Sequence, residues 1–276
     1  MIAALIIVFR EVLEAALVVS IVLAATGGVP AAKRWVGLGV LCGIAGSAVV
    51  AQFAGVIADS LSGYGQEIFN ASVLLLAVFM LAWHNAWMAV HGREIAQEMR
   101  AVGNAVREGG RPLYALAVVV GLAVMREGSE TVLFLYGLAA SDGGFADAVS
   151  GGAAGLAIGV AVGAALYLGL LRIPTRHLFS VTSWMITLLA AGMAAQSMTF
   201  LSAAGIVDLG SVLWDSSALL SENSIPGKIL HTLVGYMDRP TVLQVAVYLG
   251  ALALIYGATK FVAARHQAAQ RMASAE

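Results

Sequence analysis

Long apolar runs divide this chain, and each run is about as long as a bilayer is thick. An α-helix rises 1.5 Å per residue, so about 20 apolar residues cross the hydrocarbon core. The predicted spans are residues 2–26, 36–58, 68–91, 113–140, 151–171, 178–204 and 241–263. The pattern therefore predicts an all-α polytopic membrane protein with seven transmembrane helices.

Composition agrees with this pattern and excludes several classes of protein. The chain has 276 residues, of which 60% are hydrophobic and only 11% are charged. No basic face is present, which argues against a nucleic-acid partner. Cys42 is the only cysteine, so neither a disulfide framework nor a thiolate metal cluster is expected. The sequence contains neither His-Glu-x-x-His nor Gly-x-Ser-x-Gly, and we do not expect an enzyme.

Lysine and arginine in the connections predict how the chain is oriented. Eleven of them lie after spans one, three and five or in the C-terminal tail: Lys33, Arg34, Arg93, Arg100, Arg107, Arg111, Arg172, Arg176, Lys260, Arg265 and Arg271. Only Lys228 and Arg239 lie in connections on the opposite side. By the positive-inside rule, the N-terminus is outside and the C-terminus is inside. The outer loops are acidic and would attract cations.

Two short motifs place charge inside predicted spans one and four. Residues 10–14 read Arg-Glu-Val-Leu-Glu, and residues 126–130 read Arg-Glu-Gly-Ser-Glu. A charge at the centre of a span costs roughly 2.5 to 3.5 kcal/mol, so six unpaired charges would cost on the order of 15 to 20 kcal/mol. Because lipid does not tolerate them, we expect both motifs to face the interior of the bundle and to have a function.

The charges of the two motifs predict a cation site. On a helix, the arginine and both glutamates of one motif share a face, and each arginine can pair with the glutamate four residues later. Arg10 and Arg126 then stand against four glutamates, and the excess negative charge suits a hard cation such as iron, manganese, magnesium or calcium. The predicted metal ligands are Glu11, Glu14, Glu127 and Glu130. Salt bridges that only lock the helices together, or a proton relay without metal, are the alternatives.

Small residues at every fourth position indicate an internal repeat. They occur in span two at Gly39, Gly43 and Ser47, and in span five at Gly155, Gly159 and Gly163. The motifs are 116 residues apart (126 − 10), and adding 116 to the three span-two positions gives the three in span five. Such stripes let another helix approach closely, so we expect spans two and five to pack against the motif helices.

The repeat sets the expected organisation of the chain. Residues 1–91 and 113–204 are predicted to be two inverted three-helix repeats, joined by a cytoplasmic linker at residues 92–112. An outer loop at residues 205–240 and a seventh helix with a cytoplasmic tail at residues 241–276 lie outside the repeat. In transporters built this way, the binding site is near the midplane at the repeat interface.

The twin motifs in spans one and four of a seven-span protein resemble the oxidase-dependent iron permease family, which includes fungal high-affinity and bacterial ferrous iron permeases. The resemblance extends to residues 184–195 and 213–241. It implies a multi-pass protein of a cell membrane, the inner membrane in a bacterium, whose motif glutamates carry iron inward as Fe3+ or Fe2+ without an organic cofactor. It also implies a partner protein outside that oxidises or delivers the iron.

Other polar residues are accessory candidates. Glu67, Asp208, Asp215 and Glu222 are acids on the outer side that would form an entrance for cations, or simply solvated positions. His84 in span three is a candidate ligand or proton acceptor, or a histidine hydrogen-bonded to another helix. Together the sequence favours an iron permease with its metal between helices one and four. The alternative is a proton-coupled carrier of another cation or small solute that uses the same carboxylates.

Overall fold

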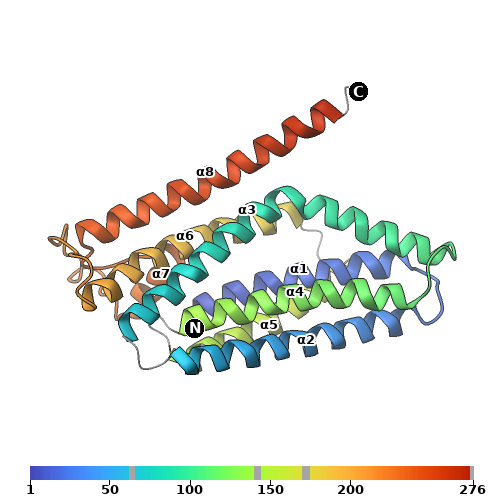
Figure 1. The fold of residues 1–276 in the computed structure, drawn as a ribbon, viewed down its shortest axis with the longest axis horizontal. Helices are drawn as coiled ribbons and strands as arrows, with labels where there is room; N and C mark the ends of the chain where they lie inside the picture. The colour runs from blue at the N-terminus through green and yellow to red at the C-terminus, as the bar shows by residue number, and fades with distance from the viewer. Residues whose placement is uncertain (62–65, 140–143, 170–174, 274–276) are drawn as a thin grey trace.

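The chain folds into a bundle of long helices (Figure 1). This computed structural model describes the chain except residues 62–65, 140–143, 170–174 and 274–276, and the described residues form no strand. The helices are α1 (Ile2–Ala25), α2 (Ala32–Leu61), α3 (Gln66–Arg107), α4 (Tyr114–Ala139), α5 (Gly144–Tyr167), α6 (Thr175–Ala203), α7 (Ile225–Val234) and α8 (Val242–Ala273). The all-α prediction is confirmed for this part of the chain.

Several helices are long and apolar enough to cross a membrane. Five meet that standard by length and composition: α2, α3, α5, α6 and α8. Helices α1 and α4 have 24 and 26 residues, and each carries the three charges of one motif. Large apolar side chains such as Leu41, Phe53 and Leu254 are exposed on the outside of the bundle, where lipid would cover them. The chain is a multi-pass membrane protein.

Two helices, α3 and α7, occupy parts of the chain that the sequence assigns to connections between spans. α3 continues 16 residues past the predicted end of span three (107 − 91), so most of the predicted linker is helical. Its mixed charges are compatible with a solvated helix, which ends just before Gly109 with its positive φ of 78°. In the predicted outer loop, the Ser224 side chain accepts a hydrogen bond from the Gly227 amide and caps α7.

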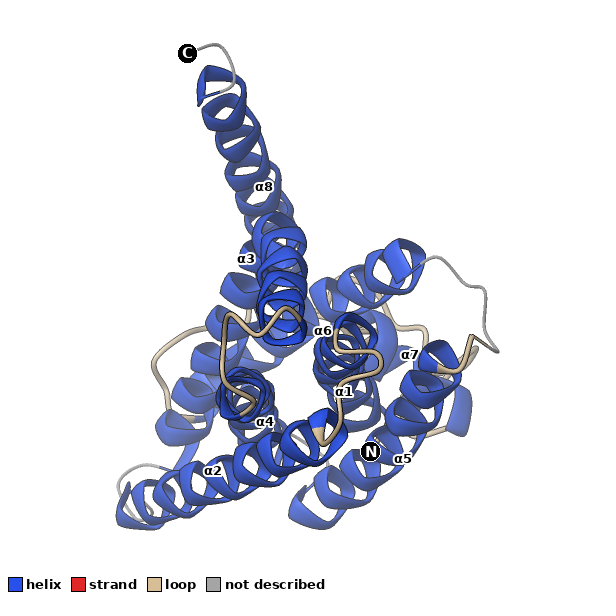
Figure 2. Ribbon diagram, turned by 90° about the vertical axis from the view of Figure 1, so that its right-hand side faces the viewer, coloured by secondary structure: helices blue, strands red, loops and turns tan. Residues whose placement is uncertain are grey.

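The small residues of α2 and α5 allow α4 and α1, the helices that carry the motifs, to pack closely against them. Figure 2 shows α2 beside α4 and α5 beside α1, and these are the most extensive helix contacts. A methyl group at Gly43 would lie 2.7 Å from Val124 Cβ, and one at Gly159 would lie 2.8 Å from Val12 Cγ1. Only a residue without a side chain permits so close an approach. The predicted packing of spans two and five on the motif helices is confirmed.

The contacts correct the predicted register of the two stripes. Gly39 packs against Ala117 and Gly151 packs against Met1. The contacted residues are 116 apart (117 − 1), but the glycines are 112 apart (151 − 39). The offset of 116 predicted for spans two and five is therefore wrong by about one helical turn. A stripe with a period of four matches itself at either offset, which is why the sequence could not distinguish them.

Apolar clusters lie on both sides of the motif charges. One contains Ile7, Leu81, Phe134 and Ile186, contributed by α1, α3, α4 and α6. The other contains Val22, Val36 and Val120 among others, at the opposite end of α1 and α4. The charged residues thus occupy the middle of the bundle, far from both ends of the helices that carry them.

Candidate metal centre

The first motif is fully buried on α1. The side chains of Arg10, Glu11 and Glu14 are only 3%, 1% and 4% exposed. Arg10 Nη1 lies 3.0 Å from Glu11 Oε1, and Arg10 Nη2 lies 2.8 Å from Glu14 Oε1. One guanidinium therefore faces two carboxylates, because helical spacing puts all three on one side of α1. A negative charge remains after this pairing.

The second motif on α4 is more open. Arg126 Nε lies 3.2 Å from Glu130 Oε1 and 3.9 Å from Glu127 Oε1. The Arg126 side chain is 37% exposed, and its guanidinium carbon lies 4.0 Å from the centre of the Trp87 ring. Guanidinium–aromatic contact at this distance is attractive and holds the arginine beside the cavity described below. The two motifs share a sequence pattern but differ in their access to the cavity.

His84 of α3 bridges the two motifs. Its Nδ1 contacts Glu130 Oε2, and its Nε2 lies 3.8 Å from Glu11 Oε2 and 3.6 Å from Glu14 Oε2. The imidazole is 3% exposed. His84 was an accessory candidate in the sequence, and the fold places it between the glutamates of α1 and α4.

Four side chains from three helices converge closely enough to share one metal ion. Ligand atoms of Glu11, His84, Glu127 and Glu130 all lie within 4.8 Å of one another. Glu11 Oε2 and Glu127 Oε2 are buried without a hydrogen-bond partner. A buried carboxylate oxygen without a partner is costly, and a cation would compensate it. Glu14, also predicted as a ligand, lies outside this group and is held by Arg10.

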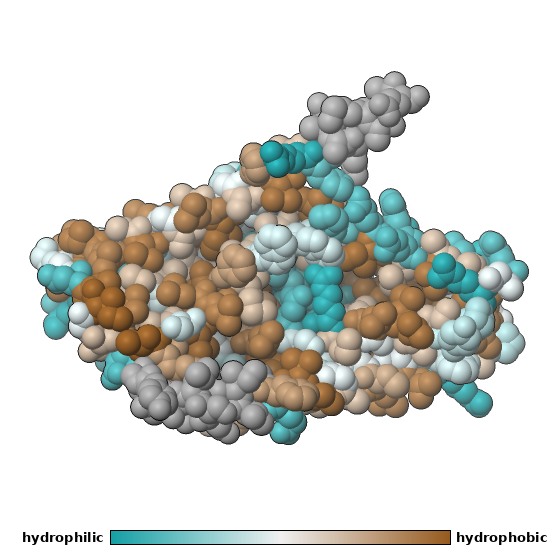
Figure 3. Space-filling model, in the orientation of Figure 1, coloured by the Kyte–Doolittle hydropathy of each residue, from teal (hydrophilic) through white to brown (hydrophobic). Residues whose placement is uncertain are grey.

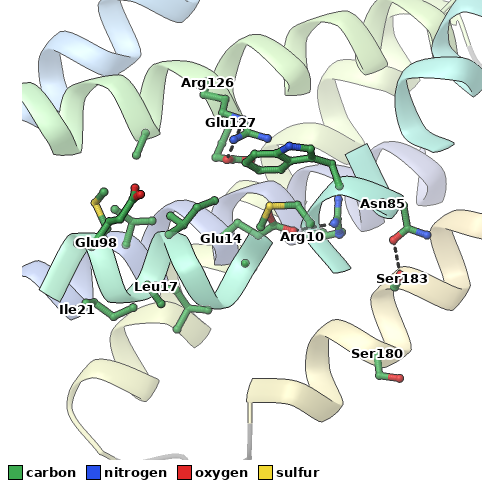
Figure 4. Close-up of a pocket in the computed structure, with 18 of the residues that line it drawn as sticks. Arg10, Glu14, Leu17, Ile21, Asn85, Glu98, Arg126, Glu127, Ser180 and Ser183 are labelled. Carbon is green, nitrogen blue, oxygen red and sulfur yellow. Dashed lines mark hydrogen bonds and ion pairs between the residues drawn. The ribbon is translucent and has the colours of Figure 1, made fainter. Parts of the chain in front are cut away.

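A cavity of about 1170 Å³ reaches these charges from one end of the bundle. Figure 4 shows Arg10, Glu14, Arg126 and Glu127 on its wall, and Asn85 with Ser183 on the α6 side. In the space-filling view, hydrophilic residues occupy a hollow near the middle of an otherwise largely apolar face (Figure 3). The charged centre is thus accessible from the end of the bundle where α1 finishes and α4 begins.

The opposite approach is closed by a layer of apolar side chains. Ile7 lies one turn before Glu11 on α1, Leu81 lies one turn before His84 on α3, and Phe134 lies one turn after Glu130 on α4. Ile7, Leu81 and Phe134 are 0%, 1% and 1% exposed and belong to one packed cluster. Beyond this layer is a second cavity of about 770 Å³.

Glu222 lies at this second cavity, at the end of the bundle that contains Met1. Glu222 and His231 both line the cavity, with His231 Nδ1 3.0 Å from Glu222 Oε1. The hydrogen bond with His231 holds the pKa of Glu222 below its ordinary value. Glu222 therefore lies on the side of the apolar layer opposite to the large cavity, and this position is compatible with its predicted role at an entrance.

The other accessory acids do not gather around this cavity. Asp215 is exposed and pairs with Arg239 at 3.0 Å, and its pKa is lowered by hydrogen bonds from Ser217 and then by Arg239. Asp208 accepts a hydrogen bond from the Gly210 amide, and Glu67 is exposed in the first turn of α3. The structure brings none of these three to the lining of either described cavity.

Two polar contacts at the cavity were not predicted from the sequence. Asn85 Nδ2 donates a hydrogen bond to Thr187 Oγ1 at 3.0 Å, and Ser183 Oγ donates to Asn85 Oδ1. These bonds fix α3 against α6 beside His84. Trp87 supports Arg126, as described above. An asparagine next to a histidine inside an apolar run was the available signal, but its partner on α6 could be identified only from the fold.

Comparison with known proteins places the chain among transporters. The model of the family described as "Iron permease FTR1 family" matches residues 1–269. The chain is 32% identical over 248 residues to the ferrous iron permease EfeU of Escherichia coli O6:H1 (strain CFT073), covering 88% of this chain and 89% of the relative. It is 31% identical over 248 residues to EfeU of Yersinia pestis, covering 88% and 87%. No solved structure matches it. The resemblance stated from the motifs is thus confirmed, and the chain belongs to the iron permease FTR1 family.

Proposed function

We propose that iron crosses the membrane through the group formed by Glu11, His84, Glu127 and Glu130. Membership of its family makes this chain an iron transporter of a cell membrane. The observation that carries the proposed route is that three carboxylates and an imidazole from three helices converge within 4.8 Å in a buried place. Glu14, with Arg10 and Arg126, then sets the charge around the ion.

The local charge favours a divalent ion. With all four glutamates ionised, two arginines leave a net charge of −2 (2 − 4), which one Fe2+ would neutralise. Carboxylates with one imidazole also suit iron better than a soft ion such as copper(I). Related proteins carry the name ferrous iron permease. We therefore propose Fe2+ as the form that occupies this group.

The topology that we propose is seven spans with an inverted repeat. Helices α1 to α3 and α4 to α6 form the two halves, residues 1–91 and 113–204, and α8 is the extra span, with residues 92–112 as the cytoplasmic linker, 205–240 as the outer loop and 241–276 as the last helix and its tail. The reciprocal contacts α2 on α4 and α5 on α1 support this symmetry. Arg100 and Lys260 line the large cavity, so by the positive-inside rule it faces the cytoplasm.

The structure then corresponds to an inward-facing state. The large cavity joins the centre to the cytoplasmic side, while the layer of Ile7, Leu81 and Phe134 blocks the outer side. Iron would enter through the acidic outer side, past Glu222, when this layer opens. A protein outside the membrane that oxidises or delivers iron would bind near the outer loop; this partner stays a prediction.

Uptake of radiolabelled ferrous iron into proteoliposomes tests the route. Glu11→Gln and Glu130→Gln keep the side-chain shape but remove the charge, and each should lower uptake at least tenfold. The matched control is Glu108→Gln, because Glu108 is exposed at the end of α3. If both central variants transport at the wild-type rate, the proposed group is wrong.

A metal-binding measurement separates this route from a proton-coupled carrier. Equilibrium dialysis of the purified protein against Fe2+ should give a bound ion that Glu130→Gln loses or binds at least tenfold more weakly. If Glu130→Gln stops uptake but binds iron as wild type does, the carboxylate moves protons and is not a ligand.

A further inference from the structure

A second cluster of metal-ligand residues lies where α3 meets α8. His91 and Glu94 come from α3 and His266 comes from α8, and all three are half-buried. His266 Nε2 lies 3.0 Å from Glu94 Oε1, and the ring centres of His91 and His266 are 5.5 Å apart at an angle of 68°. Sequence reasoning did not identify this cluster, because its histidines are 175 residues apart (266 − 91).

The spacing of these groups resembles that of ligands around one ion. Two imidazoles on a tetrahedral ion, each with a metal–nitrogen distance of about 2.1 Å, have ring centres about 5 Å apart, and neighbouring ligand atoms are about 3.3 Å apart. The observed 5.5 Å between rings and 3.0 Å between His266 and Glu94 are close to both values. The ligand atoms of this cluster are not all within the 4.8 Å that holds for the central group, so α3 and α8 must approach each other slightly for the three side chains to bind one ion.

The His91 ring is oriented as a metal-binding imidazole commonly is. Its Nδ1 lies 3.1 Å from the carbonyl oxygen of Trp87. The tautomer that donates from Nδ1 to this carbonyl presents a lone pair at Nε2, and such a backbone bond is the usual support of a histidine ligand. An ion pair between Glu94 and His266 alone would fasten the two helices without any need for this second, oriented imidazole.

The cluster lies next to the proposed iron path. His91 stacks on Trp87 with ring centres 4.7 Å apart, and Trp87 lines the large cavity. The guanidinium of Arg126, a partner of the central glutamates, lies over the same tryptophan at 4.0 Å. A contiguous set of side chains therefore runs from the central group to this cluster at the cytoplasmic mouth.

We propose that His91, Glu94 and His266 form a second site, which binds a divalent first-row transition ion as it leaves the central group. Two imidazoles and one carboxylate favour Fe2+ over Mg2+ or Ca2+, which prefer oxygen ligands. The role in release rests on the proposed function, whereas the binding does not. An open site with three protein ligands and water would bind more weakly than the buried group, as release to the cytoplasm requires.

Equilibrium dialysis of the full-length purified protein against Co2+, a spectroscopic substitute for Fe2+, tests the proposal. Wild type should bind two ions, and the double variant His91→Gln/His266→Gln should lose one of them together with the absorption bands of Co2+ bound by two imidazoles, which differ from those of the central ion with its single imidazole from His84. Glu130→Gln should lose the other ion and keep these bands. Thermal unfolding of each variant without metal checks that it is folded, and Glu94→Gln serves as a second, milder variant.

The outcomes distinguish this site from the central one. If the double variant and Glu94→Gln bind as many ions as wild type with unchanged spectra, the second site does not exist. If wild type binds a single ion that the double variant loses and Glu130→Gln keeps, the second site stands and the central metal group is wrong. In uptake assays, the double variant should transport several-fold more slowly because release is slower.

Discussion

The close approach of α2 to α4 can be tested at Gly43. Replacing its hydrogen by a methyl group would put a carbon 2.7 Å from Val124 Cβ and 2.8 Å from the Gly121 carbonyl oxygen. Carbon atoms at optimal contact are about 3.5 to 4.0 Å apart, so α4 must move away by roughly 1 Å. Because α4 carries Glu127 and Glu130, this displacement would also disturb the central group.

The expected magnitude comes from two opposing terms. Overpacking of this kind costs about 1 to 3 kcal/mol, while Gly→Ala within a helix gains at most about 1 kcal/mol. Gly37 lies on the same helix with no atom within 4 Å of an added methyl group, so Gly37→Ala has only the gain. Gly43→Ala should therefore be about 1 to 3 kcal/mol less stable than Gly37→Ala. At about 2 to 4 °C per kcal/mol, its Tm should be roughly 2 to 12 °C lower.

Thermal unfolding in detergent, followed by the loss of the monodisperse size-exclusion peak, would measure this difference. Gly155→Ala should have the same effect as Gly43→Ala. A methyl group at Gly155 would collide with Leu5 and Phe9 of α1, just as one at Gly43 would collide with α4. Equal Tm values for Gly43→Ala and Gly37→Ala would refute the close packing. A destabilised Gly43→Ala with an unaffected Gly155→Ala would refute the reciprocal arrangement of the two halves.

Three further predictions concern the centre and the outer loop. Phe134→Ala should lower the free energy of unfolding by about 3 to 5 kcal/mol and let Fe2+ leak into calcein-loaded liposomes, because it opens the apolar layer. Arg126→Lys should weaken Fe2+ binding about tenfold in dialysis, since lysine cannot reproduce the planar contacts with Glu130 and the neighbouring indole. Folding lowers the pKa of Glu222, so its ionised carboxylate stabilises the folded protein above the ordinary pKa of about 4.5. Glu222→Gln should therefore be less stable than wild type at neutral pH. A pH series of Tm values should show this difference vanish as the pH falls from about 4.5 through the lowered pKa of the folded state.

The helices and the two motifs could be predicted because their signals are local. A run of about 20 apolar residues specifies a span wherever it packs, and the charges of residues 10–14 and 126–130 are conspicuous in such runs. Helical spacing also predicts that each arginine lies beside its glutamates. In the structure, Arg10 Nη2 lies 2.8 Å from Glu14 Oε1. The stripe of Gly39 and Gly43 similarly predicted a close helix neighbour, which is α4.

What could not be predicted depends on contacts between distant residues. Nothing in the sequence favours His84 over Glu14 as the fourth member of the central group, because that choice follows from how α3 lies between α1 and α4. The same holds for His91 and His266, which meet only because α8 packs along α3. A repeating stripe also leaves its register undetermined by one period, as the offset of Gly151 from Gly39 shows.

The proposed repeat relates the closed apolar layer to the open cavity. Adding 116 to Ile7 gives Ala123, and subtracting 116 from Phe134 gives Val18, and both Val18 and Ala123 line the large cavity. Under the proposed repeat, two of the three residues of the apolar layer therefore have counterparts that line the large cavity, which predicts that Val18 and Ala123 form the seal of an outward-facing state. In a Cys42→Ser background, Val18→Cys should react quickly with a soluble maleimide and Ile7→Cys slowly, since Ile7 is buried. Equal labelling rates at the two positions would show that the two sides are not closed in alternation.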